Sequence, residues 1–199
     1  NLDFGYSIVK DKRNQSFQPT EGYKTKFMQS IPLIMDSSSI LNGLEVSKYY
    51  THSEDVIGAL RFWGRAIHGL NDEDVRIANR IYIPTTRLRG FQNRKVGPKD
   101  GTDYVGGNYA TAIGYEAQLP NLLPEATKTD IVVFIDTANL WGVDYNGSLE
   151  DSNTIRSSIG IAANMYTAVG PLSFTFAQDL SKADSDLTEF FNFRLGTSF

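Results

Sequence analysis

Hydrophobic and polar residues alternate one by one along most of this chain. The clearest alternation covers residues 108–119. One set of its alternate positions is apolar or aromatic and holds Tyr109, Thr111, Ile113, Tyr115, Ala117 and Leu119. The other set is small or polar and holds Ala110, Ala112, Gly114, Glu116 and Gln118. Because the side chains of a β-strand point to opposite faces in turn, this pattern predicts a strand with one apolar and one polar face.

The same period of two predicts about nine strands and essentially no helix. The other eight strands are expected at about residues 2–8, 22–31, 44–52, 56–68, 131–140, 155–165, 172–176 and 187–199. Polar stretches and turns that contain glycine or proline separate them. The predicted fold class is therefore all-β, with antiparallel strands.

The alternation alone does not distinguish a soluble sandwich from a membrane barrel, because both folds show it. The lengths of the strands and loops do distinguish them. Several predicted strands reach ten or more residues. Strands of soluble proteins usually have about 5–6 residues, whereas strands that cross a membrane need about 9–11. Long polar loops at residues 33–42, 71–105 and 143–153 alternate with short turns at 52–56 and 168–171. Long loops at one rim and short turns at the other are typical of an outer-membrane barrel.

Composition narrows the possible partners and chemistry. The 19 basic and 23 acidic residues give a net charge of -4, and no basic run would follow a phosphate backbone, so nucleic acid is not expected as a partner. The chain has no cysteine, and His52 and His68 have no ligand spacing with carboxylates, so no metal site is predicted. Neither a glycine-flanked nucleophilic serine nor a phosphate-binding loop occurs, so we expect neither an enzyme nor a cofactor.

The loop at residues 71–105 is far longer than the usual connection of about 4–6 residues, and it is rich in large apolar residues, so it is expected to be functional. Its residues 87–92 read Arg-Leu-Arg-Gly-Phe-Gln, and Gly-Pro-Lys and Gly-Gly-Asn follow at 97–99 and 106–108. An earlier turn, residues 16–22, reads Ser-Phe-Gln-Pro-Thr-Glu-Gly. These motifs resemble those of the BamA family of outer-membrane assembly factors, from which Leu88 departs because valine is commonest there.

The resemblance implies that residues 1–199 are the C-terminal part of an outer-membrane β-barrel of about sixteen strands. It also implies that the loop at 71–105 folds into the lumen and is held there through its motif, Arg89, Gly90 and Phe91. The family's strand glutamate and strand aspartate match Glu116 and Asp136 in this chain.

Strand geometry leads to the same two carboxylates. Glu116 and Asp136 are expected on the lumen faces of neighbouring strands, which lie about 4.8 Å apart. One planar guanidinium can bind both, and Arg89 is the expected partner. The alternative is that Glu116 and Asp136 are solvated carboxylates without a partner.

The strand count predicts an incomplete barrel. Nine antiparallel strands cannot close without a parallel seam, and an open sheet would expose unpaired backbone groups to lipid. Asn1 leads directly into an alternating strand, without a charged leader or an apolar signal core. The chain is therefore expected to begin in mid-structure, with the first strands and soluble periplasmic repeats upstream.

The last predicted strand, residues 187–199, carries aromatic residues at alternate positions and resembles the assembly signal of outer-membrane barrels. We expect it to form one side of the seam between the first and last strands, with Phe191, Phe193, Leu195, Gly196 and Phe199 as the seam residues. A glycine near the strand end weakens pairing and permits a kink, although Gly196 also fits a simple packing role.

The expected function is the folding and insertion of β-barrel proteins into the bacterial outer membrane. Its expected partners are unfolded outer-membrane proteins, outer-membrane lipid and accessory lipoproteins. Two alternatives remain from the sequence: a related secretion barrel, of the TamA-like or two-partner type, and a passive porin or soluble binding barrel.

Overall fold

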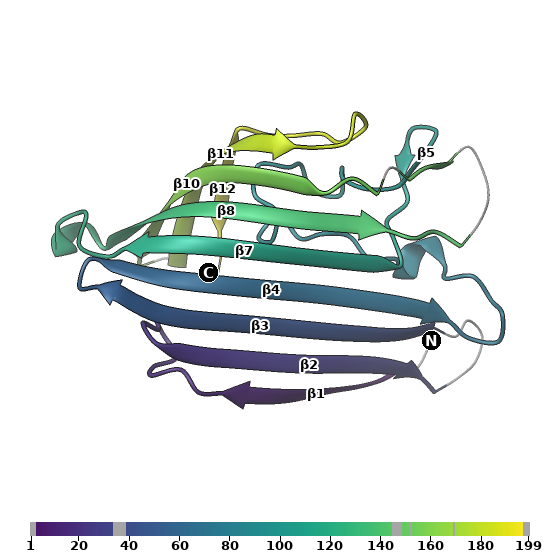
Figure 1. Ribbon diagram of the computed structural model, residues 1–199, viewed down its shortest axis with the longest axis horizontal. Coiled ribbons are helices and arrows are strands. Elements are labelled where there is room, and N and C mark those ends of the chain that lie inside the picture. The colour runs from purple at the N-terminus through teal and green to yellow at the C-terminus, as the bar shows by residue number, and fades with distance from the viewer. Residues whose placement is uncertain (1–2, 34–38, 145–148, 152, 169, 197–199) are drawn as a thin grey trace.

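Nine antiparallel strands form one curved sheet in the computed structural model, which describes residues 3–33, 39–144, 149–151, 153–168 and 170–196 (Figure 1). In order across the sheet, the strands are β1 (Asp3–Asp11), β2 (Gly22–Pro32), β3 (Ser39–Ser53), β4 (Val56–Gly69), β7 (Tyr109–Leu119), β8 (Thr129–Trp141), β10 (Arg156–Thr167), β11 (Gly170–Ser181) and β12 (Phe191–Leu195). Each strand pairs with the next one along this order, and β1 and β12 form the two edges. The predicted all-β antiparallel class and the nine predicted strands are confirmed, although β12 has only five residues.

Three short strands, which the alternation did not predict, lie in the connections. They are β5 (Lys99–Asp100), β6 (Asp103–Tyr104) and β9 (Leu149–Glu150), in the order β6-β5-β9. They join the β4–β7 connection to the β8–β10 connection. Two single helical turns, η1 (Ile77–Asn79) and η2 (Glu125–Thr127), complete the described elements, and neither is long enough to span a membrane.

The two rims of the sheet differ less than predicted. The two-residue turn between β3 and β4 lies at one end of the strands, and the long connection between β4 and β7 lies at the other (Figure 1). The β1–β2 and β7–β8 connections, residues 12–21 and 120–128, are longer but lie at the same end as the short turn. The predicted loop at 33–42 is shorter than expected, because β3 already begins at Ser39. The connection between β4 and β7 covers residues 70–108 and is the longest of all.

The convex face of the sheet is apolar and stays exposed. Strand register places Val133, Ile161, Phe176 and Phe191 in one row across β8, β10, β11 and β12. These side chains are between 39% and 51% exposed. A row of exposed large apolar residues on a folded sheet matches a surface that faces hydrocarbon rather than water.

The packed core lies on the concave face, which we call the lumen side. There, apolar residues of the long connection pack onto the inner faces of β4, β7 and β8. We call this cluster the loop core, and it comprises Val75, Ile81, Ile83, Leu88, Phe91 and Val96 from the connection and Trp63, Ile67, Ala110, Ala112, Ala138 and Leu140 from the strands. The small strand residues make room for the large loop residues, so the loop fills the lumen side of the sheet.

A charged residue on the convex face tests which solvent this face meets. Ile161→Arg, in the middle of β10, is expected to lower the free energy of unfolding by about 2–4 kcal/mol, because the guanidinium would lie near the centre of the bilayer. Ile155→Arg is the matched control, since Ile155 precedes the same strand at the rim, where the cost falls to about 0–1 kcal/mol. Urea unfolding of the complete protein in lipid vesicles measures both, and equal losses would contradict a lipid-facing surface.

Candidate functional site

Arg89 lies in the long connection and reaches carboxylates on two neighbouring strands. Its Nε and Nη2 atoms donate to the two oxygens of Asp136, each at 2.7 Å, and its Nη1 atom lies 2.8 Å from Oε1 of Glu116. Its backbone N–H also donates to Asp136, at 3.0 Å. The three side chains are only 15%, 5% and 2% exposed, in the order Arg89, Glu116, Asp136. The structure therefore brings together the three charged residues that the sequence proposed as partners.

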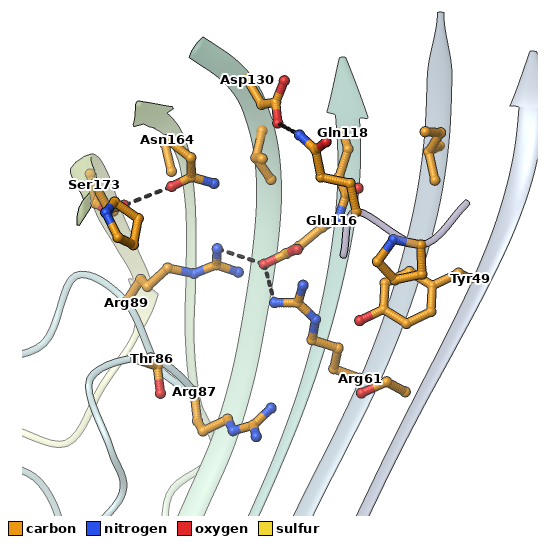
Figure 2. A pocket seen from close by; sticks show the side chains of 18 of the residues that line it. Tyr49, Arg61, Thr86, Arg87, Arg89, Glu116, Gln118, Asp130, Asn164 and Ser173 are labelled. Atoms are coloured by element: carbon orange, nitrogen blue, oxygen red, sulfur yellow. Dashed lines mark hydrogen bonds and ion pairs between the residues drawn. The ribbon is translucent and has the colours of Figure 1, made fainter. Parts of the chain in front are cut away.

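Arg61 of β4 is a second cation in the same cluster. Its Nη1 atom donates to Oε1 of Glu116 at 2.9 Å, so two guanidinium groups approach one carboxylate from different sides (Figure 2). With Asp136, the cluster holds two positive and two negative charges. Such a balance offsets part of the cost of taking these charges out of water.

The neighbouring strands β7 and β8 keep Arg89 charged and in place. Burial lowers the pKa of Arg89. Its hydrogen bond with Asp136 and the charge of Glu116 raise that pKa by more than burial lowers it, so the pKa lies above its usual value. The guanidinium carbon also lies 3.6 Å from the centre of the Phe134 ring, a cation–π contact. A glycine on β7 leaves room for the cluster, because a Cβ atom on Gly114 would lie 2.9 Å from Oδ1 of Asp136.

The backbone around Arg89 requires a glycine at the next position. Gly90 has a φ of +88°, which side-chain-bearing residues rarely adopt, and a Cβ there would lie 2.9 Å from the Cβ of Ala177 on β11. Ser158 of β10 donates a hydrogen bond to the backbone oxygen of Arg89. The motif therefore lies directly on the sheet, and Phe91, which is 2% exposed, belongs to the loop core.

The predicted seam residues lie apart from this charged cluster. Phe191, Phe193 and Leu195 are exposed on β12, and the N–H of Gly196 donates to the oxygen of Pro171 at 3.1 Å. Phe199 lies outside the described residues. The predicted start of this strand at residue 187 is wrong, because residues 187–189 pair with the long connection instead of with β11.

A second buried ion pair, which sequence reasoning missed, joins the start of β10 to the connection between β11 and β12. Arg156 donates from Nε to Oδ2 of Asp186 at 2.8 Å, and the two side chains are 1% and 0% exposed. The sequence shows Arg156 on the polar side of a strand and Asp186 in a polar run, both of which also fit solvated residues. No local pattern indicates that these two residues, thirty positions apart, bind each other.

A cavity of about 1030 Å³ lies beside the cluster, on the lumen side of the sheet. Charged residues of both signs line it, including Lys26, Glu45, Arg61 and Glu116. The turn between β1 and β2 reaches across it, since Nε2 of Gln18 donates to Oδ2 of Asp130 at 2.6 Å. Within the described part of the chain, no group of three or more histidine, cysteine or acidic side chains is placed to hold a metal ion.

Comparison with known proteins relates the whole chain to one family. The Omp85 superfamily domain matches residues 1–199. The outer membrane protein assembly factor BamA of Neorickettsia risticii is 27% identical over 199 residues, which cover 98% of this chain and 27% of that protein. A SAM50-like protein of Schizosaccharomyces pombe is 36% identical over 130 residues, which cover 62% of this chain and 27% of that protein. The chain thus spans about a quarter of the length of these relatives.

A solved structure shows the same fold. The crystal structure of BamA from Haemophilus ducreyi lacking POTRA domains 1–3 superposes with a TM-score of 0.85 at 22% identity. The match covers 97% of this chain and 41% of that one. The nine-stranded sheet therefore corresponds to part of a BamA-like barrel. The chain belongs to the Omp85 superfamily, and its strands form part of a bacterial outer-membrane β-barrel.

Proposed function

We propose that this chain is the barrel part of a factor that folds and inserts other β-barrel proteins into the outer membrane. The relatives named as outer membrane protein assembly factors support this proposal. The observation that carries it is the short edge strand β12, which pairs with β11 at five positions, whereas β10 and β11 pair at eleven.

A short edge strand suits strand addition. The even-numbered residues of β12 face β11, since Phe190 accepts from Ala177 and Gly196 donates to Pro171. The N–H and C=O groups of Phe191, Phe193 and Leu195 therefore point to the free edge. An incoming unfolded strand can pair with such an edge through its backbone and needs no particular side chains. Few hydrogen bonds hold β12 in place, so its displacement costs less than that of the longer strands.

The proposed partners are unfolded outer-membrane proteins and the lipid around the barrel, together with accessory lipoproteins. The proposed activity forms and breaks only noncovalent contacts, so the chain is not proposed to be an enzyme. The loop core and the buried arginine cluster give the lumen side a fixed wall against which the edge can open.

A secretion barrel is the second candidate, because the cavity of about 1030 Å³ has charged walls of both signs that suit the passage of an unfolded chain. A passive porin fits less well, since the long connection packs into the lumen side through its own apolar core.

Site-specific crosslinking tests the proposed function. A photoreactive residue at Phe193 of the complete protein, reconstituted in lipid with an unfolded barrel substrate, is expected to crosslink to the substrate, because the backbone of this residue faces the free edge. Ile113 is the matched control, since it is equally exposed, at 51%, but lies in the middle of the sheet. Equal crosslinking at the two positions would contradict the proposal. Substrate transport across the bilayer without insertion would instead favour the secretion barrel.

A further inference from the structure

The carboxylate of Asp186 joins three parts of the chain. It accepts hydrogen bonds from Nε and Nη2 of Arg156, at 2.8 and 3.3 Å, so that the pair is bidentate. The backbone N–H of Ala183 donates to it at 2.7 Å, and the N–H of Gly97 donates to it at 3.1 Å. The start of β10, the β11–β12 connection and the long connection thus meet at one buried group.

Arg156 is equally constrained. Its Nη1 atom donates to the side-chain oxygen of Asn139 on β8 at 2.9 Å and to the backbone oxygen of Thr154 at 2.7 Å. Together with the two bonds to Asp186, these hydrogen bonds fix the orientation of the guanidinium group. Asp186 is consequently held at one position relative to the wall of the barrel.

The residues that follow Asp186 form a small ladder with the loop motif. Leu187 donates to the oxygen of Lys95 at 3.0 Å and accepts from Gln92 at 2.9 Å. Glu189 donates to the oxygen of Gly90 at 2.9 Å, and Phe91 and Thr188 form a bridge. The segment that precedes β12 is therefore bound to the loop on the lumen side and not to the wall.

The same segment has a second possible partner on the wall. Continuing the register of β11 and β12 beyond Phe176 and Phe191 would place Leu187 opposite Leu180. Leu187 shares the parity of Phe191, Phe193 and Leu195, although Glu189 interrupts the apolar alternation. Residues 187–189 cannot lie against the loop in the lumen and against β11 in the wall at once, so the two arrangements exclude each other.

We propose that Arg156 and Asp186 are positioning residues that set where the seam strand begins. By holding the segment after Asp186 on the loop, the pair makes β12 begin only at Phe191 and keeps the free edge short. Loss of the pair allows β12 to extend along β11, which lengthens the edge available to an incoming strand. The effect on the pairing of an incoming substrate strand rests on the proposed function, whereas the change in the length of β12 does not.

A disulfide between residues 180 and 187 reports the longer strand. In the continued register these residues form a non-hydrogen-bonded pair, whose Cα atoms lie about 4.5 Å apart, a distance that a disulfide tolerates. Leu180 and Leu187 are 58% and 44% exposed, so cysteines at both sites remove little packing, and the chain has no other cysteine. The experiment uses the complete protein in lipid vesicles with a mild oxidant, and counts only folded barrels, identified by their heat-dependent shift in gel mobility.

With L180C and L187C in place, Asp186→Asn is expected to raise the ratio of crosslinked to free protein about tenfold, which corresponds to a change of about 1.4 kcal/mol in the balance of the two arrangements. Arg156→Lys keeps the charge but not the bidentate geometry and is expected to give a smaller rise. Asp184→Asn is the matched control, because Asp184 is an exposed aspartate two residues away, and it is expected to leave the ratio unchanged.

Equal ratios for Asp186→Asn and Asp184→Asn would overturn the proposal. If Asp186→Asn leaves too few folded barrels, Arg156→Lys decides the question by the same ratio. A raised ratio without any change in substrate crosslinking at Phe193 would keep the positioning role and contradict the proposed link to insertion.

Discussion

Replacing Arg89 with alanine is expected to lower the free energy of unfolding of the barrel by about 3–5 kcal/mol, because it leaves Glu116 and Asp136 buried without their shared cation. The screening expected from a wet lumen is small, since the two carboxylate side chains are only 5% and 2% exposed. Arg61 still neutralises part of the charge on Glu116, so most of the lost free energy of unfolding comes from the unpaired charge of Asp136. We also expect the loop to become accessible to protease and the proposed insertion activity to fall.

Denaturant unfolding of the complete protein in lipid, together with limited proteolysis, measures this effect. Arg87→Ala is the matched control in the same loop, because Arg87 reaches Glu45 only at 3.5 Å and the two side chains are 26% and 27% exposed. Such a pair contributes about 1 kcal/mol or less. If the two alanine variants unfold at the same denaturant concentration, the arginine cluster does not stabilise the loop.

Replacing Phe91 with alanine is expected to cost a similar amount, about 3–5 kcal/mol, for an apolar reason. The ring is 2% exposed and fills part of the loop core against the small residues of β7 and β8, so its removal leaves a cavity that the rigid sheet cannot close. The bridge between Phe91 and Thr188 would loosen as well, which frees the segment that precedes β12.

The same unfolding measurement applies, with Phe190→Ala as the control. Phe190 is 65% exposed and contacts the ring of Phe176 at 5.9 Å, which accounts for about 1 kcal/mol. A loss at Phe91 no greater than that at Phe190 would mean that the loop packs loosely on the wall. Arg89→Ala and Phe91→Ala thus test separately the ion pairs and the apolar packing that hold the loop on the sheet.

The sequence by itself determined the strands and their faces. A period of two is a local property, since each residue of a strand points opposite to its neighbours whatever the strand packs against. The alternation in residues 108–119 placed Glu116 on the lumen side, and the same parity placed Asp136 there on the next strand. The resemblance of residues 87–92 to the BamA family then supplied Arg89 as the partner, which the structure places within 2.8 Å of both carboxylates.

Only the tertiary structure decided how the connections pair. The strand that begins at Phe191, the three-stranded sheet of β5, β6 and β9, and the buried pair of Arg156 and Asp186 all depend on segments far apart in the chain. The connecting segments carry no periodic signal that shows what they pair with, because a connection follows the shape of its surroundings instead of a regular backbone. Residues 187–189 show this most clearly. The sequence assigned them to the last strand of the wall, yet the buried charge of Asp186 and the backbone groups of the loop hold them in the lumen.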